Sequence, residues 1–435
     1  MMTLEIFEWQ NLGPEQQDRL LERPAQGIDA SIRDRVADIL NQVRTGGDAA
    51  VRALTAEIDG VDMTECRVAE GEFAAAAREL TARDIEAIDL AIANVRRFHE
   101  QQLPQDIAIE TMPGVLCERI SHPLDSVGLY VPAGTAPLPS AAIMLAVPAA
   151  IAGCPVRVLC TPPRPDGTAD PAVLVAASRA GITDVFKIGG AQAVAAMAFG
   201  TGTVPKVRKI FGPGNAWVTC AKTLVSSDPA GAAIDLPAGP SEVLVIADDS
   251  AHAEFVAADL LSQAEHGTDS QVMLVTTSSR LAEAVRAETA TQLELLSRAD
   301  IARQALAESR VITVDTLDEA IAISNRYAPE HLILQFREPR NMLDAVRNAG
   351  SIFIGDWSPE SVGDYSSGTN HVLPTYGYGS AYSGLGVDQF MRFTTVQELT
   401  RDGLAALGDA TTALADLEGL DAHAAAVTRR LEFDA

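Results

Sequence analysis

The fold class is decided by residues 126–161, which read SVGLYVPAGTAPLPSAAIMLAVPAAIAGCPVRVLCT. The stretch opens and closes on short runs rich in β-branched residues. Between these runs, residues 138–156 carry no charge and are about as long as a membrane span, but three prolines and a glycine interrupt them. This composition favours a helix buried against a sheet. Strand, helix and strand in this order are typical of a parallel sheet with helices on its faces.

The same alternation continues through most of the chain in two series. The first series of expected strands comprises SVGLYV (126–131), VRVLCT (156–161), DVFKI (184–188) and RKIF (208–211). The second comprises SEVLVIAD (241–248), QVMLVTT (271–277), RVITVD (310–315), HLILQF (331–336) and SIFIGDW (351–357). Two series predict two sheets, joined by a Gly/Pro-rich hinge near 238–240. We expect a ligand between the two lobes or at the carboxyl ends of the strands.

Helical segments flank the two series. Residues 28–103 place apolar residues at three- and four-residue intervals, which is typical of amphipathic helices. After Gly386 the chain again has a mostly helical pattern, and this tail is too short to build a large core of its own. We expect the tail to pack on another surface, in its own subunit or in a second one.

Composition narrows the classes of function. The 435 residues are 47% hydrophobic and 21% charged, as in a globular protein. The formal net charge of −26 argues against binding to nucleic acid or to an anionic membrane, because both require a basic patch. Five cysteines follow no regular spacing, which favours a reducing compartment. The first residues, MMTLEIFEW, lack the basic and apolar regions of an export signal, so we expect a cytoplasmic protein.

A first pair of residues that could carry chemistry lies at the end of an expected helix. Gln263 and His266 stand three residues apart in LLSQAEHG (260–267), so both project from the same side of the last turn. The negative end of the helix dipole favours a bound cation there. Alone, the pair is a weak metal signal, because a surface or hydrogen-bonded histidine is the more common case.

A second pair, Glu330 and His331, follows Pro329, which should end the preceding helix. A neighbouring acid and imidazole could supply a general base and an activator of water. In a regular strand, however, successive side chains point to opposite faces. Both can reach one site only if the chain after Pro329 is not fully extended, and spacing alone leaves a functional pair and a plain polar loop equally open.

The most unusual segment is GDWSPESVGDYSSGTNHVLPTYGYG, residues 355–379. It holds Asp356, Glu360, Asp364 and His371 within a long run of small and polar residues. Binding residues concentrate in loops that join rigid strands. The length and polar content of the segment therefore favour a functional loop over a structureless one.

Two Gly-rich turns could bind an anion, in KIGGAQAVAAMAFG (187–200) and KIFGPGNAWVTCAK (209–222). Each places glycines between a strand and a helix, where backbone N–H groups can hold a phosphate. The signal is weak alone, since glycine also serves simple tight turns. The G-x-G-x-x-G, G-x-S-x-G and H-E-x-x-H motifs are absent, which leaves a serine hydrolase and a zincin-type protease unsupported.

Taken in order, seven stretches resemble the histidinol dehydrogenase family. They are GLYVPAGTAPLPS (128–140), GGAQAVAAMAFGT (189–201), KIFGPGNAWVT (209–219), AIDLPAGPSEVLVIAD (233–248), LLSQAEHG (260–267), YAPEHL (327–332) and GDWSPESVGDYSSGTNHVLPTYG (355–377). The resemblance covers essentially the whole chain and is loosest in its amino-terminal third, where we transfer no functional residue. Seven motifs in the same order are far more specific than any one of them. Together they outweigh the non-functional explanation given above for each separate motif.

The resemblance implies a role for each matching residue. The zinc ligands are expected at Gln263, His266, Asp364 and His423, which also contact the substrate. Proton transfer is expected at Glu330 and His331, and His331 also contacts the substrate. Ser241, His371 and Glu418 match positions that hold or face the substrate, and Tyr130, Gln192 and Asn215 match positions that line the dinucleotide.

The fold implied is α/β, with two incomplete Rossmann-like parallel-sheet domains and small helical N- and C-terminal extensions. On this chain the expected parts are residues 1–27 as N-terminal extension, 28–125 plus 241–385 as the first domain with the metal and catalytic residues, 126–240 as the second, dinucleotide-contacting domain, and 386–435 as a helical C-terminal tail. The family resemblance also implies a homodimer with exchanged tails, in which Glu418 and His423 come from the other subunit.

The reaction implied is the last step of histidine biosynthesis, the oxidation of L-histidinol to L-histidine through bound L-histidinaldehyde. It would use two NAD⁺ and one Zn²⁺ per subunit. A mixed Gln/His/Asp site leaves room for exogenous ligands, so we expect the metal to orient the substrate and not to supply redox chemistry. A dehydrogenase of a related amino alcohol and a catalytically silent two-lobed ligand-binding protein remain as alternatives. A metal hydrolase using Glu330 would leave the two anion-binding turns unexplained.

Overall fold

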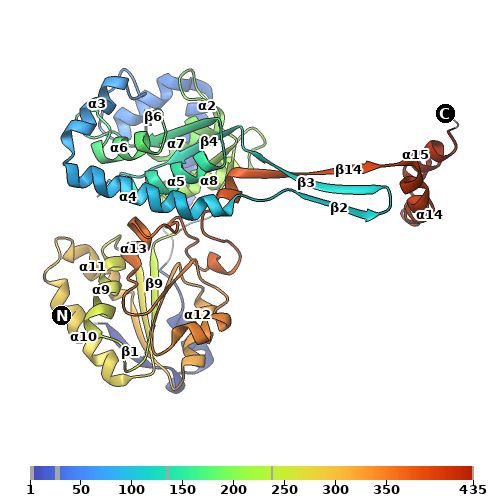
Figure 1. Ribbon diagram of the computed structural model, residues 1–435. Coiled ribbons are helices and arrows are strands. Elements are labelled where there is room, and N and C mark those ends of the chain that lie inside the picture. Colours follow the sequence, from blue (N-terminus) through green and yellow to red (C-terminus); the bar gives the residue numbers. More distant parts are fainter. Residues whose placement is uncertain (1–3, 25–29, 134–136, 237–238, 434–435) are drawn as a thin grey trace.

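The computed structural model describes residues 4–24, 30–133, 137–236 and 239–433. They form two lobes, each built around a parallel sheet, and a long arm that leaves one lobe (Figure 1). The expected α/β architecture with two parallel sheets is therefore confirmed. Within the described part of the chain, no helix is long and apolar enough to span a bilayer. The uncharged stretch at 138–156 instead contains α5 (Pro139–Ile151), which is buried as expected.

The first series of expected strands builds a five-stranded sheet in the order β6-β5-β4-β7-β8. Its strands are β4 (Ser126–Tyr130), β5 (Val156–Thr161), β6 (Asp184–Lys187), β7 (Lys209–Phe211) and β8 (Ala233–Ile234). On one face lie α5 and α6 (Pro171–Arg179), and on the other lie α7 (Gly190–Phe199) and α8 (Ala216–Ser227). Both faces are covered, which explains why its strands are mostly apolar and lack a regular alternation with polar residues.

The second series builds a six-stranded parallel sheet in the order β1-β11-β10-β9-β12-β13. Its strands are β1 (Glu5–Glu8), β9 (Glu242–Ala247), β10 (Gln271–Thr276), β11 (Arg310–Thr313), β12 (His331–Gln335) and β13 (Ser351–Ile354). The core on one face includes α9 (Ala253–Ala264), α10 (Ser279–Leu293) and α11 (Ala299–Ala307), and on the other it includes α1 (Pro14–Leu20) and α12 (Leu317–Tyr327).

The amino-terminal segments are distributed differently from the expected domains. β1 pairs with β11, so the expected helical extension contributes an edge strand to the second sheet. The helices α2 (Ala30–Ile58), α3 (Glu70–Glu79) and α4 (Ala82–His99) pack on α5, α6, α7 and α8 of the other lobe. Residues 28–125 therefore do not form one domain with 241–385. Their apolar stripes, such as Val36 and Ile39 on α2, cover the first sheet's helices. The expected boundary at 27/28 and position 238 of the hinge lie outside the described residues.

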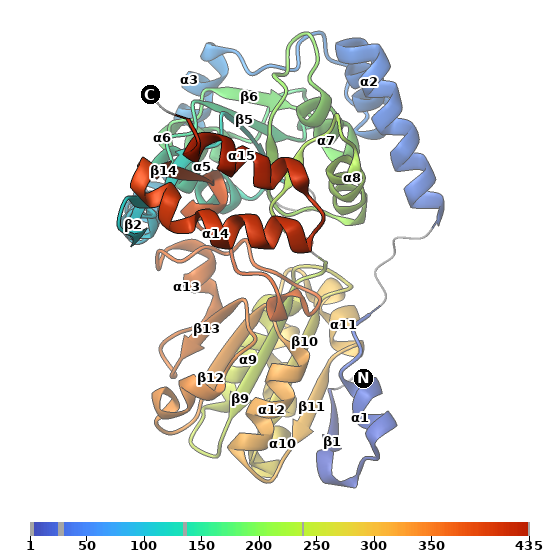
Figure 2. The same ribbon diagram turned by 90° about the vertical axis from the view of Figure 1, so that its right-hand side faces the viewer.

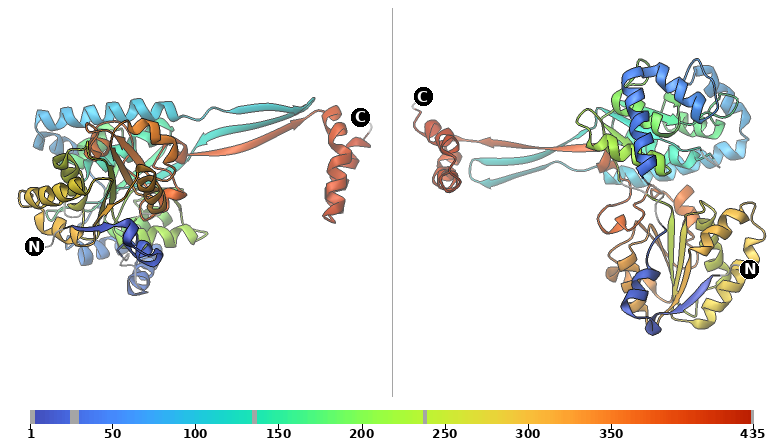
Figure 3. Two further views of the ribbon diagram at one scale, coloured as in Figure 1. Left: turned by 90° about the horizontal axis from the view of Figure 1, so that it is seen from below. Right: turned by 180° about the vertical axis from the view of Figure 1, so that it is seen from behind.

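The tail expected to be helical contains a strand before its two helices. β14 (Met391–Leu399) pairs antiparallel with β3 (Val115–Pro123), which pairs antiparallel with β2 (Ile107–Met112). These strands form the arm, and α14 (Arg401–Leu417) and α15 (Asp421–Leu431) pack together at its end, away from both lobes (Figure 3). Figure 2 looks along the arm, with α14 and α15 nearest the viewer. Short 3-10 helices complete the structure at η1 (Trp9–Asn11), η2 (Glu100–Gln102), η3 (Pro339–Ala345), η4 (Tyr378–Ser380) and η5 (Val387–Phe390).

Candidate active site

The candidate site is assembled where the two lobes face each other. A cavity of about 320 Å³ is lined by Pro213, Gly214 and Asn215 from one lobe and by Ser241, His266 and Gly267 from the other. The first group follows β7, at the carboxyl edge of its sheet, whereas Ser241 precedes β9, at the amino edge of the other sheet. The expected cleft between the lobes is thus present, but only one of the two sheets offers the carboxyl ends of its strands.

Glu330 and His331 are buried at the amino end of β12. The preceding helix α12 stops at Ala328, which has a left-handed backbone with φ of 52°, and Pro329 prevents its continuation. Glu330 therefore lies before the strand, so its side chain need not point to the face opposite that of His331. Its Oε2 lies 3.5 Å from Nδ1 of His331, so the two side chains share one site. The chain bends after Pro329, as the sequence required for two neighbouring side chains to reach one site.

The backbone of Glu242, the first residue of β9, holds both side chains. Its N–H donates to Oε2 of Glu330 at 2.9 Å, and its carbonyl oxygen lies 3.0 Å from Nδ1 of His331. A carbonyl oxygen can only accept, so Nδ1 carries a proton and donates it. In the neutral ring Nε2 is then the basic nitrogen. It is buried, makes no hydrogen bond to any residue that the structure describes, and lies 3.5 Å from Oδ1 of Asp364.

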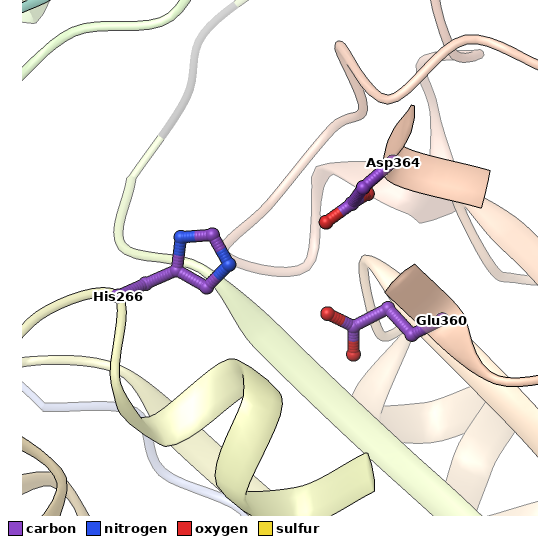
Figure 4. Close-up of side chains that lie close together, drawn as sticks. All are labelled: His266, Glu360 and Asp364. Atoms are coloured by element: carbon purple, nitrogen blue, oxygen red, sulfur yellow. The ribbon is translucent and has the colours of Figure 1, made fainter. Parts of the chain in front are cut away.

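Three ligand-type side chains converge beside this pair. The ligand atoms of His266, Glu360 and Asp364 lie within 4.8 Å of one another, and the side chains face a common space (Figure 4). His266 follows the carboxyl end of α9, and the other two lie one turn apart on the short helix α13 (Glu360–Tyr365). A set of one imidazole and two carboxylates suits a divalent transition metal. The residues present therefore fit the metal that the family resemblance implies.

Gln263 and His371 complete this cluster. Gln263 is buried in the last turn of α9, and in the orientation that satisfies its amide the nitrogen donates to Glu360. Nδ1 of His371 donates to the backbone carbonyl of Asp364 at 2.8 Å, which ties the polar loop to α13. His371 and Ser241 also line a smaller cavity next to Glu330.

The electrostatics of the cluster favour a cation. Burial raises the pKa of Glu330 to about 8 and raises the pKa of Glu360 well above its usual value. Burial acts to lower the pKa of His331, but the carboxylates of Glu330, Glu360 and Asp364 outweigh it and raise that pKa. Several carboxyl groups thus share a buried space, where each disfavours the charge of the others. A bound cation would relieve this repulsion.

A second cavity, of about 570 Å³, lies at the carboxyl edge of the first sheet. Its lining includes Tyr130, Gln192 and Asn215, the three residues that the resemblance places at the dinucleotide, together with Asp59 and Trp217. The hydroxyl of Tyr130 accepts from the N–H of Gly190 at 3.1 Å, and Asn215 caps the amino end of α8. Asn215 lines both this cavity and the one between the lobes, so the two cavities are neighbours.

Two expected site residues lie far from the rest within one chain. Glu418 ends α14 and His423 lies in α15, at the tip of the arm, and both are exposed. Gln263, His266, Glu330, His331, Asp364 and His371 are brought together by the fold of the second-series lobe. The arm carries the remaining two away from them (Figure 1).

Sequence reasoning assigned no role to Glu360, although it named this residue within the polar loop. The signal was present, because Glu360 and Asp364 are four residues apart and would share one face of a helix. The polar composition of residues 355–379 predicts a loop throughout, and the short helix α13 within it is the difference that brings Glu360 to the site. Arg23, Asp59 and Glu242 also hold or line the site. The sequence contains no comparable signal for them, because their hydrogen-bond partners are distant in sequence.

Known proteins resemble this chain along nearly its whole length. Residues 21–431 match the family model described as histidinol dehydrogenase. The curated histidinol dehydrogenase of Xanthomonas oryzae pv. oryzae is 56% identical over 428 residues, covering 98% of this chain and 99% of that protein. The one from Vibrio parahaemolyticus is 55% identical over 424 residues, covering 98% and 97%. A crystal structure of histidinol dehydrogenase from Elizabethkingia anophelis aligns with a TM-score of 0.95 and 44% identity, over 99% of this chain and 98% of that one.

Proposed function

The chain belongs to the histidinol dehydrogenase family, and on this premise we propose which of its residues carry the reaction. The protein is an NAD-linked oxidoreductase that converts L-histidinol to L-histidine by two successive oxidations, through L-histidinaldehyde, at the end of histidine biosynthesis. The relatives support this activity over the two alternatives, a dehydrogenase of another amino alcohol and a silent ligand-binding protein.

His331 acts as the general base in both oxidations. The observation that carries this role is the bond from Nδ1 to the carbonyl of Glu242, which leaves Nε2 as the buried, basic nitrogen. In the first step Nε2 takes the hydroxyl proton of L-histidinol while a hydride leaves the alcohol carbon for NAD⁺. In the second step it takes a hydroxyl proton of the aldehyde hydrate while the second hydride leaves for another NAD⁺.

Glu330 forms that hydrate. Its pKa of about 8, raised by burial, allows its carboxyl group to exchange a proton near neutral pH. The carboxylate takes a proton from a water molecule as the water oxygen bonds to the aldehyde carbon. The N–H of Glu242 holds one carboxylate oxygen, which orients the group without protonating it.

Gln263, His266 and Asp364 hold one Zn²⁺ per subunit, and the partner subunit's His423 completes the set. This proposal is supported by the convergence of His266 and Asp364 with Glu360 and by the burial of Gln263 beside them. When bound, the ion would bind the imidazole and amino groups of the substrate and so orient its alcohol carbon. Ser241, His371 and the partner subunit's Glu418 contact the same substrate.

The dinucleotide occupies the cavity lined by Tyr130, Gln192 and Asn215. Support comes from the amino ends of α7 and α8, where the dipole of a helix favours an anion such as a phosphate, although the N–H groups of Gly190, Trp217 and Val218 already have side-chain acceptors. Because Asn215 lines both cavities, a nicotinamide ring can reach the space next to His266.

A homodimer brings Glu418 and His423 to the other subunit's site. The arm exposes large apolar side chains at its end, including Leu414 and Leu417, which are 62% and 84% exposed in the single chain. A three-stranded ribbon without a core is marginally stable by itself, and a second subunit would cover these side chains.

A cytoplasmic location also belongs to this proposal. It is supported by five unpaired cysteines, which suit a reducing compartment.

The proposal is tested with His331→Asn protein, L-histidinol and NAD⁺. Wild-type protein should release two NADH per L-histidine, whereas the variant should turn over about 10²- to 10⁴-fold more slowly. Its zinc content should equal that of the wild type, because His331 is assigned as a base and not as a ligand. Turnover within threefold of the wild type, or loss of zinc, would overturn the assignment.

A further inference from the structure

A buried ion pair lies directly behind the proposed catalytic residues. Nε and Nη2 of Arg23 donate to Oε1 and Oε2 of Glu242 at 2.5 and 3.0 Å. The two side chains are only 12% and 3% exposed. Paired bonds between a guanidinium and a carboxylate fix the relative orientation of the two groups. A buried ion pair adds little net stability to a fold. The fixed geometry of this pair therefore points to a role other than stabilisation.

Arg23 also holds the end of the helix that leads to Glu330. Nη2 donates to the carbonyl oxygen of Tyr327 at 2.6 Å and to that of Ala328 at 3.4 Å. The guanidinium carbon lies 3.8 Å from the centre of the Tyr327 ring. The last carbonyls of a helix lack partners within the helix, and here the arginine satisfies that of Tyr327. Only Pro329 separates this bonded segment from Glu330.

Glu242 links the same arginine to His331. The side chain of Glu242 is held by Arg23, and its backbone bonds both Glu330 and Nδ1 of His331. A third segment joins at this point, because the N–H of Tyr376 donates to Oε1 of Glu242 at 2.7 Å. Tyr376 has a φ of 56°, which is rare for a residue with a side chain and persists only where surrounding bonds impose it.

We propose that Arg23 is a positioning residue of the reaction, because it clamps the start of β9 to the end of α12 and so keeps Glu330 and His331 in their working geometry. The inference rests on the proposed roles of these two residues. Among the described residues, Arg23 hydrogen-bonds Glu242, Tyr327 and Ala328 and neither Glu330 nor His331. It lies in the amino-terminal segment, to which sequence reasoning gave no function, and it acts through Glu242.

The competing explanation is a purely structural ion pair. In that case its loss would lower the melting temperature and leave the turnover of the folded enzyme unchanged. Positioning predicts a different result, since a displacement of about 1 Å in a reacting group can cost about 100-fold in rate. The turnover number, measured together with KM and zinc content, therefore distinguishes a positioning role from a purely structural one.

The experiment compares Arg23→Lys, Arg23→Met, Glu242→Gln and the double variant Arg23→Met/Glu242→Gln with the wild type. Lysine keeps the charge but loses the paired bonds, and the double variant leaves no unpaired buried charge. We expect each to lower kcat for L-histidinol oxidation about 10- to 100-fold, with KM for NAD⁺ and zinc content within about twofold. The double variant should be no slower than either single variant, because both act through one clamp.

Arg337→Met is the control. It breaks an arginine–carboxylate pair with the largely buried Asp248, at 3.2 Å, at the carboxyl end of β9. Because Arg337 is 64% exposed, its loss should change stability little and leave kcat unchanged. A kcat within twofold of the wild type in Arg23→Lys and in the double variant, or an effect no larger than that of Arg337→Met, would overturn the inference. If His331→Asn and Glu330→Gln also kept their turnover, the proposed function would fail as well; if those two were inactive, only the role of Arg23 would fail.

Discussion

In the amide orientation that gives its nitrogen an acceptor, Nε2 of Gln263 donates to both carboxylate oxygens of Glu360, at 3.0 and 2.6 Å. Both side chains are buried. With its nitrogen engaged in this way, the amide of Gln263 has only its oxygen left to accept a bond or to bind a cation. Glu360 thereby orients a proposed metal ligand, and its own carboxylate lies in the same cluster as His266 and Asp364.

Glu360→Gln should therefore weaken the proposed metal site. The substitution removes the charge and one of the two acceptors for the amide of Gln263. Outer-shell partners of this kind contribute about 10- to 100-fold to metal affinity, and we expect a loss of that size for Zn²⁺. Competition with a chelator of known affinity measures it, and activity should return when zinc is added in excess. Asp356→Asn, in the same segment but outside the cluster, should change neither quantity. Equal zinc affinities of Glu360→Gln and wild-type protein would refute this role for Glu360.

Local patterns predicted much of the fold because each expected strand and helix depends on its own residues. The apolar runs at 126–131 and 331–336 are strands in the structure, and Gln263 does lie in the last turn of a helix. The placement of 30–99 could not be predicted in this way. An amphipathic helix shows that one face is covered, but not which of two apolar sheets covers it.

The arm and the support of the site escaped prediction for a different reason. All six residues of β2 are exposed, and Ile107 and Ile109 alternate with only Ala108 and Glu110, so this short run has no clear apolar–polar alternation that would mark a strand in the sequence. The backbone of Glu242 holds Glu330 and His331 through groups that every residue possesses. No residue type signals such contacts, and the pairing of β9 with β12 brings them together across nearly ninety positions.

The stability of the second-series lobe should depend on pH through Asp259. Burial raises the pKa of this carboxyl group from its ordinary value of 3.8 to about 7, although Gln335 donates to it at 2.7 Å. The folded state holds this proton more tightly than the unfolded state does. Its contribution to stability is therefore lost as pH rises from 3.8 to about 7, and it stays constant above that range.

Asp259→Asn should remove this dependence. The amide oxygen can still accept from Gln335, so the variant mimics the protonated acid. The free energy of unfolding should be equal for the two proteins near pH 4, with the variant more stable by roughly 4 kcal/mol or less near pH 8. Urea unfolding at a series of pH values measures the difference, and taking the difference cancels the other titrating groups. A constant difference across this range would contradict the prediction.

Leu417 should stabilise the homodimer. It is 84% exposed in the single chain and directly precedes Glu418 at the end of the arm. Burial of a leucine is worth about 1.5–3 kcal/mol, so Leu417→Asp should raise the dissociation constant of the dimer at least about tenfold. Sedimentation over a range of concentrations measures it. Leu295 is 82% exposed on a lobe, and Leu295→Asp should leave the dimer unchanged. Equal dissociation constants for the two variants would argue against an interface at the tip of the arm.

Exchange of the tails is tested by mixing two inactive proteins. His266→Asn damages the site in the lobe, and His423→Asn damages the tip of the arm, so each homodimer should be inactive. In a mixed dimer with exchanged arms, one site combines both defects and the other combines the intact lobe of one chain with the intact arm of the other. Random reassortment makes half of the dimers mixed, so about a quarter of the wild-type activity should return. If each arm instead served its own lobe, every site in a mixed dimer would keep one defect. Verified mixed dimers that show no NADH formation would therefore exclude the exchange and assign His423 to the site of its own chain.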